Sequence, residues 1–355
     1  MSKSIRTLAL LSVVSVAAAD PTAEALIDNG HFKRAREIAE PAYKAHPEDA
    51  HANYVLARIQ HEFNNLDDAA KLAEAAVRLD PKSSPAHREL GEIYADQADH
   101  ASFLKQLGFA RKVHAEFDAA LAIAPKDPDN LFDQVQYFME APGVVGGDKN
   151  KAAQLANDLL QIDPARGYLA LAYIARTEKQ DDKLEGLYQK AVHANPRNYE
   201  AQITLANYYI SPQHADFVQA EQHSQAALEL NPDRIEAYRM LAIVLVLQKR
   251  YDDAAKLIAR AQQAIPDDLS PCVYAARAML RSGLELPEAE TYLKKYFTET
   301  REPEAGAPLI AGAHWSLGLV YEKEGRKQDA RNELETALRL KPDFEPARKD
   351  LKRLK

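Results

Sequence analysis

One segment of the sequence is rich in glycine and is similar to a phosphate-binding loop. It is Gly143-Val-Val-Gly-Gly-Asp-Lys149. Such a loop requires the pattern G-x-x-x-x-G-K-[ST] directly after a strand. Here Asp148 takes the place of the second glycine, Asn150 takes the place of the hydroxyl residue, and a helical segment comes before. Because an acid at the mouth of the loop would repel phosphate, the segment predicts an extended turn and no nucleotide site.

Histidines and pairs of aspartates are the other groups that could bind a metal or form a catalytic dyad. The eleven histidines contain no H-E-x-x-H motif, and a single cysteine excludes a Cys/His zinc site. We interpret His46, His51 and His61 as solvent-exposed side chains. Acidic pairs recur where predicted helices begin, a position that the helix dipole favours: Asp67-Asp68, Asp181-Asp182 and Asp252-Asp253. We therefore predict no catalytic residue, no metal site, no cofactor and no enzymatic activity.

The composition of the 355 residues is typical of a folded, soluble protein, with 46% hydrophobic and 28% charged residues. The net charge of −8 provides no electrostatic footprint for nucleic acid. The only cysteine, Cys272, lies in an apolar stretch, and we interpret it as a small buried hydrophobic residue. Because one thiol cannot form an internal disulfide, folding must depend on packing.

The first nineteen residues have the layout of a secretory signal peptide. Lys3 and Arg6 form a positive head, Leu8 to Val16 is an apolar run, and Ala17-Ala18-Ala19 supplies the small residues of a cleavage site. The apolar run is too short to cross a bilayer as a stable helix, although an uncleaved anchor is the alternative. We expect cleavage after Ala19, a periplasmic or secreted protein, and no stable membrane insertion.

The rest of the chain repeats itself with a period near 34 residues. A proline closes each of eight helical stretches: Pro47, Pro81, Pro125, Pro164, Pro196, Pro232, Pro266 and Pro342. Small or aliphatic residues stand five and twelve positions before each proline, as Ala261 and Ala254 do before Pro266. A spacing of seven places the two positions on one helix face. Their small side chains let another helix approach closely, and the proline then ends the helix.

A second helix with its own signature precedes each of these stretches. The pattern Leu-Gly/Ala-x-x-Tyr occurs at Leu90, Leu205 and Leu317, and residues tolerant of left-handed backbone fall at the turns: Gly30, Asn64 and Gly325. These motifs resemble the tetratricopeptide repeat, and the segment 309–342 matches nearly every position of its pattern. The resemblance implies an all-α, right-handed solenoid of about nine helix pairs, followed by a capping helix at 344–355. The expected pairs are 20–47, 48–81, 84–125, 128–164, 165–196, 198–232, 233–266, 269–303 and 309–342.

Three segments depart from the regular repeat. Extra length in 84–125 predicts an extended second helix near 95–116, and the fourth pair contains a long inter-helix loop at 140–148. Residues 301–308 contain two prolines and a glycine. They predict a loop or kink that separates the array 20–303 from a C-terminal unit, 309–355.

The resemblance also implies a concave groove lined by the first helix of each pair. Counting along the repeat pattern assigns a partner-binding set of mixed charge and partly aromatic character: Tyr54, Arg58, Arg88, Glu92, Asn207, Arg239 and Trp315, with His51, Glu200, Thr204, Ile243 and Leu319 at further groove positions. This set does not reproduce the Lys/Asn carboxylate clamp of some family members. The alternative is that these residues form only a solvated face.

The sequence therefore predicts a non-catalytic, periplasmic or secreted interaction scaffold that binds a protein or peptide partner along its concave face. The alternative is an accessory subunit of an envelope transport or assembly machine, in which the array would hold a small molecule in an apolar pocket.

Overall fold

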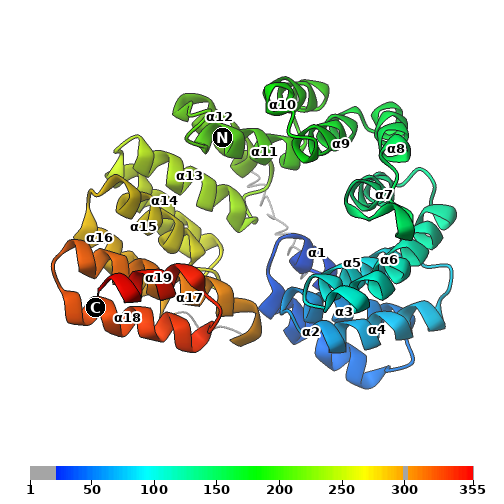
Figure 1. Ribbon diagram of the computed structural model, residues 1–355, viewed down its shortest axis with the longest axis horizontal. Coiled ribbons are helices and arrows are strands. Elements are labelled where there is room, and N and C mark those ends of the chain that lie inside the picture. The colour runs from blue at the N-terminus through cyan, green and yellow to red at the C-terminus, as the bar shows by residue number, and fades with distance from the viewer. Residues whose placement is uncertain (1–20, 299–302, 355) are drawn as a thin grey trace, which may run out of the picture.

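A computed structural model describes residues 21–298 and 303–354 of the chain, and the predicted signal peptide lies outside these residues. The described residues form nineteen α-helices and two short 3₁₀ helices, and they contain no strand. Successive helices pack in antiparallel pairs (Figure 1). The all-α fold, with nine helix pairs forming a right-handed solenoid and a capping helix at its end, agrees with the prediction.

The pairs follow one another along the chain, and a single helix covers the last pair. They are α1 (Ala23–Asp28) with α2 (Phe32–Ala45), α3 (Ala50–Glu62) with α4 (Leu66–Leu79), α5 (Ser84–Asp99) with α6 (Phe103–Ile123), α7 (Pro128–Glu140) with α8 (Lys149–Ile162), α9 (Pro164–Thr177) with α10 (Leu184–Ala194), α11 (Tyr199–Ile210) with α12 (Phe217–Leu230), α13 (Ile235–Leu247) with α14 (Tyr251–Ala264), α15 (Ser270–Ser282) with α16 (Leu286–Tyr296), and α17 (Pro303–Lys323) with α18 (Lys327–Leu340); the capping helix is α19 (Glu345–Arg353).

Short turns inside the pairs use a left-handed residue to reverse the chain. Gly30, Asn64 and Gly325 have φ values of 83°, 59° and 78°, as the sequence predicted. Lys179 and Lys249 occupy the same conformation at φ values of 60° and 62°. In each turn the following amide bonds to a carbonyl five residues back, which satisfies the end of the first helix; the distance from Arg326 N to Tyr321 O, for example, is 2.8 Å.

The small residues that mark the repeat are packing positions. Fifteen of the sixteen marker residues are buried, and the exception is Ala42 in the first pair, which is exposed. In α14, Ala254 and Ala261 are 0% and 1% exposed, and they join a core cluster that extends over pairs six to nine. Close approach between helices therefore depends on the absence of larger side chains at these positions.

Leucine at Ala261 is expected to overpack this core and to lower the free energy of unfolding by about 1–3 kcal/mol. Ala259 is exposed on the same helix, so Ala259→Leu is a matched control that should change stability by less than about 0.5 kcal/mol. Urea unfolding of the two variants measures the difference. Equal losses in both would mean that the packing register is wrong.

The two irregular pairs in the middle of the chain form one feature. Helix α6 has 21 residues, but it begins at Phe103, so residues 95–99 of the extension predicted near 95–116 belong to α5 instead. The loop between α7 and α8 contains a 3₁₀ turn at Gly143–Val145 that contacts α6. The ring of His114 on α6 stacks on Tyr137 with centroids 5.0 Å apart, and Tyr137 donates a hydrogen bond to the carbonyl of Val145. Asp148 caps α8 by accepting from the amides of Asn150 and Lys151. The glycine-rich segment is therefore a turn packed on the extended helix.

The predicted loop at 301–308 is wrong for its described part, because α17 already begins at Pro303. Proline is well accommodated as the first residue of a helix, where its missing N–H costs no hydrogen bond. Leu317 and Tyr321 of α17 belong to the same core cluster as Leu293 of α16. The last pair therefore continues the core of the preceding pairs.

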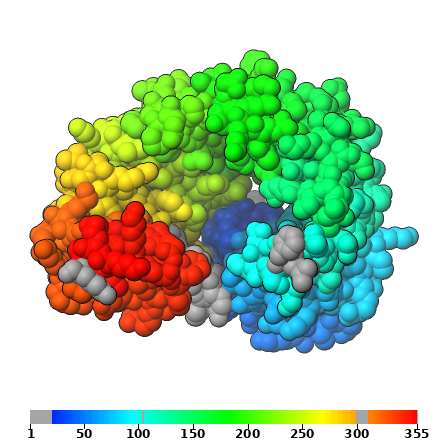
Figure 2. Space-filling model, in the orientation of Figure 1, coloured from blue at the N-terminus to red at the C-terminus, as the bar shows by residue number. Residues whose placement is uncertain are grey.

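The solenoid curls round into a ring (Figure 1), and its first pair contacts the loops that come before α13 and before α15. Lys33 donates a hydrogen bond from Nζ to the carbonyl of Asp267 at 2.9 Å, and Arg34 Nε lies 3.3 Å from the Asp267 carboxylate. Asn231 donates to Asn29 at 2.8 Å, and His31 is only 2% exposed. In Figure 2 the N-terminal residues, in dark blue, occupy part of the opening of the ring. We call this the closure contact.

Charge reversal at Asp267 should loosen the closure contact. Asp267→Arg places a second guanidinium beside Arg34, and like charges brought together at an interface cost several kcal/mol. Hydrogen exchange of the α1 and α2 amides is expected to accelerate at least about tenfold, the factor that 1.4 kcal/mol produces. The control is Asp252→Arg, a reversal at an exposed residue of α14. Unchanged exchange in Asp267→Arg would show that the contact does not hold the first pair.

Candidate partner-binding groove

The inner face of the ring carries a pocket in the C-terminal half, formed by the first helices of four pairs and by the capping helix. Its volume is about 940 Å³, and α11, α13, α15, α17 and α19 contribute its walls. We call it the C-terminal pocket. Its lining is largely aliphatic and aromatic with a cationic rim: Asn207, Ile210, Ile243, Tyr274, Arg277, Leu280, Arg281, Trp315, Ser316, Leu319, Glu322, Lys323 and Arg353.

The predicted groove residues divide between this pocket and the rest of the concave face. Asn207 and Trp315 lie together in the C-terminal pocket, and so do Ile243 and Leu319. The charged members of the set lie elsewhere, where they pair with opposite charges of the same chain. The pocket is therefore the part of the predicted groove that can accept a partner without first breaking ion pairs.

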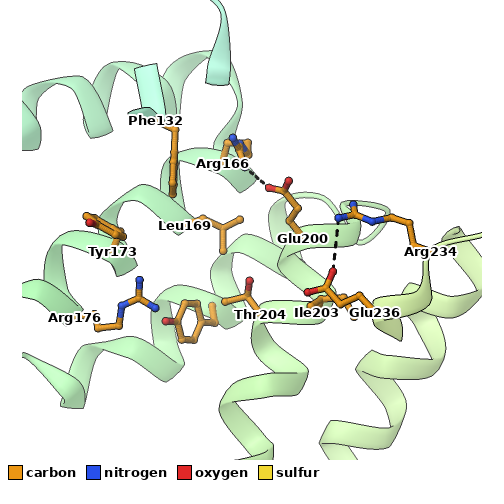
Figure 3. A pocket seen from close by; sticks show the side chains of 11 residues that line it. Phe132, Arg166, Leu169, Tyr173, Arg176, Glu200, Ile203, Thr204, Arg234 and Glu236 are labelled. Atoms are coloured by element: carbon orange, nitrogen blue, oxygen red, sulfur yellow. Dashed lines mark hydrogen bonds and ion pairs between the residues drawn. The ribbon is translucent and has the colours of Figure 1, made fainter. Parts of the chain in front are cut away.

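Alternating charges cross the middle of the groove from α5 to α11, and we call them the charge ladder. Arg88 lies 3.6 Å from Glu92 and 2.8 Å from Asp129, and Arg166 lies 2.5 Å from Asp129 and also pairs with Glu200. Figure 3 shows the Arg166–Glu200 pair at the edge of a smaller pocket of about 320 Å³. A partner that bound these residues would first have to break the ion pairs between them. The ladder therefore connects neighbouring helix pairs and is a poor site for a ligand.

The other predicted arginines are also paired within the chain. Arg58 donates to Asp28 at 2.8 Å and lies over the ring of Tyr54, with 5.8 Å between the guanidinium carbon and the ring centroid. Arg239 donates to Asp268 at 2.9 Å and to Ser270 at 2.6 Å. Both arginines link the first helix of one pair to a neighbouring pair, and each is held in place by an acid.

Arg277, on α15, differs from these arginines and was missed by the sequence analysis. It is half-buried, its Nε donates to Ser316 Oγ at 3.2 Å, and no described carboxylate lies within ion-pairing distance. Burial lowers the pKa of its guanidinium below the usual value. The eighth pair lacks the Leu-Gly/Ala-x-x-Tyr marker, so counting along the repeat assigned no groove positions there. The alternation of Tyr274 and Arg277 with buried alanines was the available signal.

Trp315 contributes one face to the pocket and uses the other side to hold the capping helix. Its Nε1 donates to Asp350 on α19 at 2.8 Å, and its ring meets Phe344 edge-on with centroids 5.9 Å apart. The side chain is half-buried. The indole is therefore fixed in position before any partner arrives.

His61, predicted to be solvent-exposed, is instead only 15% exposed and lies between two acids. Its Nδ1 is 2.9 Å from Glu89 and its Nε2 is 3.0 Å from Asp96. Burial alone would lower the pKa of His61, but hydrogen bonds to Asp96 and Glu89 outweigh it and raise the pKa to about 10. Glu92 lies close enough to complete a set of three metal-ligand side chains. A protonated imidazole has no lone pair for a metal, so the geometry favours a structural ion-pair cluster.

The pH dependence of stability should report this cluster. Because the folded pKa of His61 lies above its unfolded value of about 6.5, the stabilisation is complete below pH 6.5 and is lost as the pH rises toward 10. His61→Gln is therefore expected to cost about 2 kcal/mol at pH 6, and the difference from wild type should shrink at pH 10. Urea unfolding at the two pH values measures it. A cost independent of pH would indicate a neutral His61.

Burial also raises the pKa of two acids near the charge ladder. It combines with the neighbouring carboxylates of Glu89 and Asp133 to raise the pKa of Glu92 to about 8. Burial raises the pKa of Asp133 to about 7, against the opposing influence of Arg88. Burial therefore opposes ionisation of these two acids in the middle of the groove.

These features define a class of protein: an α-solenoid of helix pairs with a concave, pocketed inner face. Three family models described as Tetratricopeptide repeat match the chain, one at residues 22–84 and 62–108, one at 213–280 and one at 311–344. Together they cover more than half of it. The chain belongs to the tetratricopeptide repeat family.

Curated relatives resemble the chain at 24% identity. One is the human Protein O-mannosyl-transferase TMTC3, where the match covers 80% of this chain and 27% of that protein. The other is Anaphase-promoting complex subunit 3 of Schizosaccharomyces pombe, where the match covers 79% of this chain and 39% of that protein. The chain thus spans well under half the length of either. Among solved structures, yeast Tom70 is similar at 15% identity, over 94% of this chain and 86% of that chain, with a TM-score of 0.47. A tetratricopeptide repeat protein of Thermus thermophilus matches at 20%, over 52% and 94%, with a TM-score of 0.46.

Proposed function

We propose that the protein is a non-catalytic interaction scaffold that holds a segment of a protein partner in the C-terminal pocket. Tetratricopeptide arrays expose a long concave surface suited to protein binding, so the fold suggests this class of function. The observation that carries the proposal is the pocket itself. It combines an apolar wall from four first helices with polar groups at its rim, the composition of a recognition site.

The proposed place of action is the periplasm or the extracellular space. The support is the positive head, apolar run and small residues of positions 1–19. Within 21–298 and 303–354, no helix combines the length and apolar character that a membrane span requires. Mass spectrometry of the expressed protein tests the proposal: a chain that starts at Asp20 supports export, and retention of residues 1–19 contradicts it.

A second candidate function is an accessory subunit that holds a small molecule. The observation in its favour is the pocket volume of about 940 Å³, since small-molecule sites occupy roughly 300–1,000 Å³. Native mass spectrometry of the purified protein separates the two functions. A discrete bound mass of a few hundred daltons, displaced on unfolding, would favour the accessory subunit.

The test of the scaffold function uses a random twelve-residue peptide library displayed on phage and selected on the full chain. Selected peptides are then measured against Ile243→Arg, which places a charged side chain in the pocket, and against Val218→Arg, where the wild-type residue is 71% exposed on α12. We expect binding to Ile243→Arg to weaken at least tenfold and binding to Val218→Arg to stay unchanged. Selection of no peptide, or equal binding by both variants, would overturn the proposed function.

A further inference from the structure

We propose that the C-terminal pocket recognises a peptide segment in which a carboxylate stands next to a bulky apolar side chain, with Arg277 binding the carboxylate. The inference rests on the proposed function and specifies the chemistry of the partner. It follows from the one half-buried arginine of the pocket, from the charges at the pocket rim, and from the apolar surface beside them.

The donors of Arg277 are only partly used within the chain. A guanidinium has five N–H donors, and the described hydrogen bond of Arg277 uses Nε, with Ser316 as the acceptor. Ser316 in turn donates to the carbonyl of Gly312 at 2.7 Å, so it is fixed. The ring of Tyr274 lies beside the guanidinium, with 6.0 Å between the guanidinium carbon and the ring centroid. The Nε of Arg277 is therefore bound within the chain, while its terminal nitrogens have no described acid partner.

Other half-buried arginines of the concave face show what Arg277 lacks. Arg88, Arg166 and Arg239 are buried to a similar degree, and each lies within 3 Å of a carboxylate of the chain. A desolvated cation without a counter-ion is costly, and a carboxylate that enters the site relieves that cost. No described carboxylate takes this place at Arg277, and we assign the acid to the partner.

The pocket rim favours an anion throughout. Arg281 and Lys323 are exposed cations that line the pocket. Glu322 is the pocket's only acidic lining residue, and Arg353 already neutralises it through a hydrogen bond of 2.8 Å. This local excess of positive charge stands in a chain whose net charge is −8, so it would steer an acidic segment to this face.

Apolar side chains line the same pocket as the cation. Ser316, which binds Arg277, follows Trp315 in the chain, and Leu319 and Ile243 continue the same wall. A peptide whose acidic residue meets Arg277 therefore presents its neighbouring side chain to the indole. Arg277 is the one half-buried cation of the pocket and matches a singly charged carboxylate, whereas the further cations that a doubly charged phosphate would need lie at the exposed rim.

The experiment uses the peptides selected on the full chain. We expect them to contain Asp or Glu within two residues of Leu, Ile, Phe or Trp. One such peptide is synthesised in two forms, with Glu and with Gln, and both are titrated against wild type, Arg277→Gln and Arg78→Gln, the last an exposed arginine on α4. Arg277→Gln should weaken binding of the Glu peptide at least tenfold and change binding of the Gln peptide by no more than about twofold. The difference between the two effects is the interaction energy of a double-mutant cycle. Arg78→Gln should change neither.

The outcomes separate this inference from the function on which it rests. One outcome is a peptide that binds Ile243→Arg more weakly than wild type and yet binds equally well after the Glu-to-Gln change or to Arg277→Gln. That result would support the scaffold function and overturn the carboxylate assignment. Phosphoserine peptides that bind more tightly than their Glu counterparts would also overturn it. Helicity and the midpoint of unfolding are recorded for each variant as a check on folding. Arg277→Lys keeps the positive charge, so it should recover part of the affinity that Arg277→Gln loses if that loss is not caused by misfolding.

Discussion

Alanine at Gly167 is expected to lower the free energy of unfolding by about 3 kcal/mol, near the upper end of typical overpacking costs. Gly167 is a buried residue of α9, and a β-carbon there would lie 2.3 Å from the Cα of Leu160 on α8 and 2.5 Å from its amide nitrogen. The obstacle is backbone, so a side-chain rotation cannot relieve it. The helices of the fourth and fifth pairs would have to move apart.

Gly186 provides the matched control, because it lies within α10 and a β-carbon there has no neighbour within 4 Å. Gly186→Ala should stabilise the protein by about 0.5–1 kcal/mol, since alanine loses less backbone entropy on folding. Urea unfolding of the two variants should therefore give opposite signs. A loss below about 1 kcal/mol at Gly167 would mean that α8 and α9 are not in backbone contact.

The second large effect concerns Trp315. Trp315→Ala is expected to cost about 3 kcal/mol, the lower end of the range for truncating a buried tryptophan, because the indole is half-buried. The loss includes the hydrogen bond to Asp350 and the edge contact with Phe344. The rate of hydrogen exchange should increase more in α19, which depends on these contacts, than in the first six pairs.

Trp315→Phe is the control for this substitution, since it keeps most of the apolar surface and removes the hydrogen bond. It should cost about 1–1.5 kcal/mol, the usual contribution of a hydrogen bond plus a small loss of packing. If Trp315→Ala leaves exchange in α19 at the wild-type rate, the indole does not hold the capping helix. Its place in the pocket would then have to depend on α17 alone.

The sequence predicted the helix pairs because their boundaries are set locally. Small residues seven apart, a proline at the end and a left-handed residue at the turn act within one or two helices, as at Ala254, Ala261 and Gly325. The start of α17 was misjudged because Pro303 can begin a helix as well as interrupt one. Local rules therefore recovered the repeat and failed where one residue type has two roles.

The groove was harder to predict, because position along a repeat does not reveal which charges are paired. Arg88 and Arg239 stand at groove positions, yet acids from neighbouring pairs neutralise them. No described carboxylate lies within ion-pairing distance of Arg277, and only the three-dimensional arrangement distinguishes it in this way from the paired arginines. The closure contact joins residues more than 200 positions apart, so no local pattern encodes it. His61 was misjudged for a similar reason, since both of its acidic partners lie in the next pair.

The central claim is that a partner segment occupies the C-terminal pocket, and Trp315 tests it directly because it is the only tryptophan of the chain and lines that pocket. Titration with a selected peptide that contains no tryptophan should shift the indole emission to shorter wavelength and reduce its quenching by acrylamide, with the same midpoint as binding measured by calorimetry. The Ile243→Arg variant should show neither change. A peptide that binds by calorimetry while the emission and the quenching of Trp315 stay constant would contradict the claim, because the partner would then bind outside the pocket.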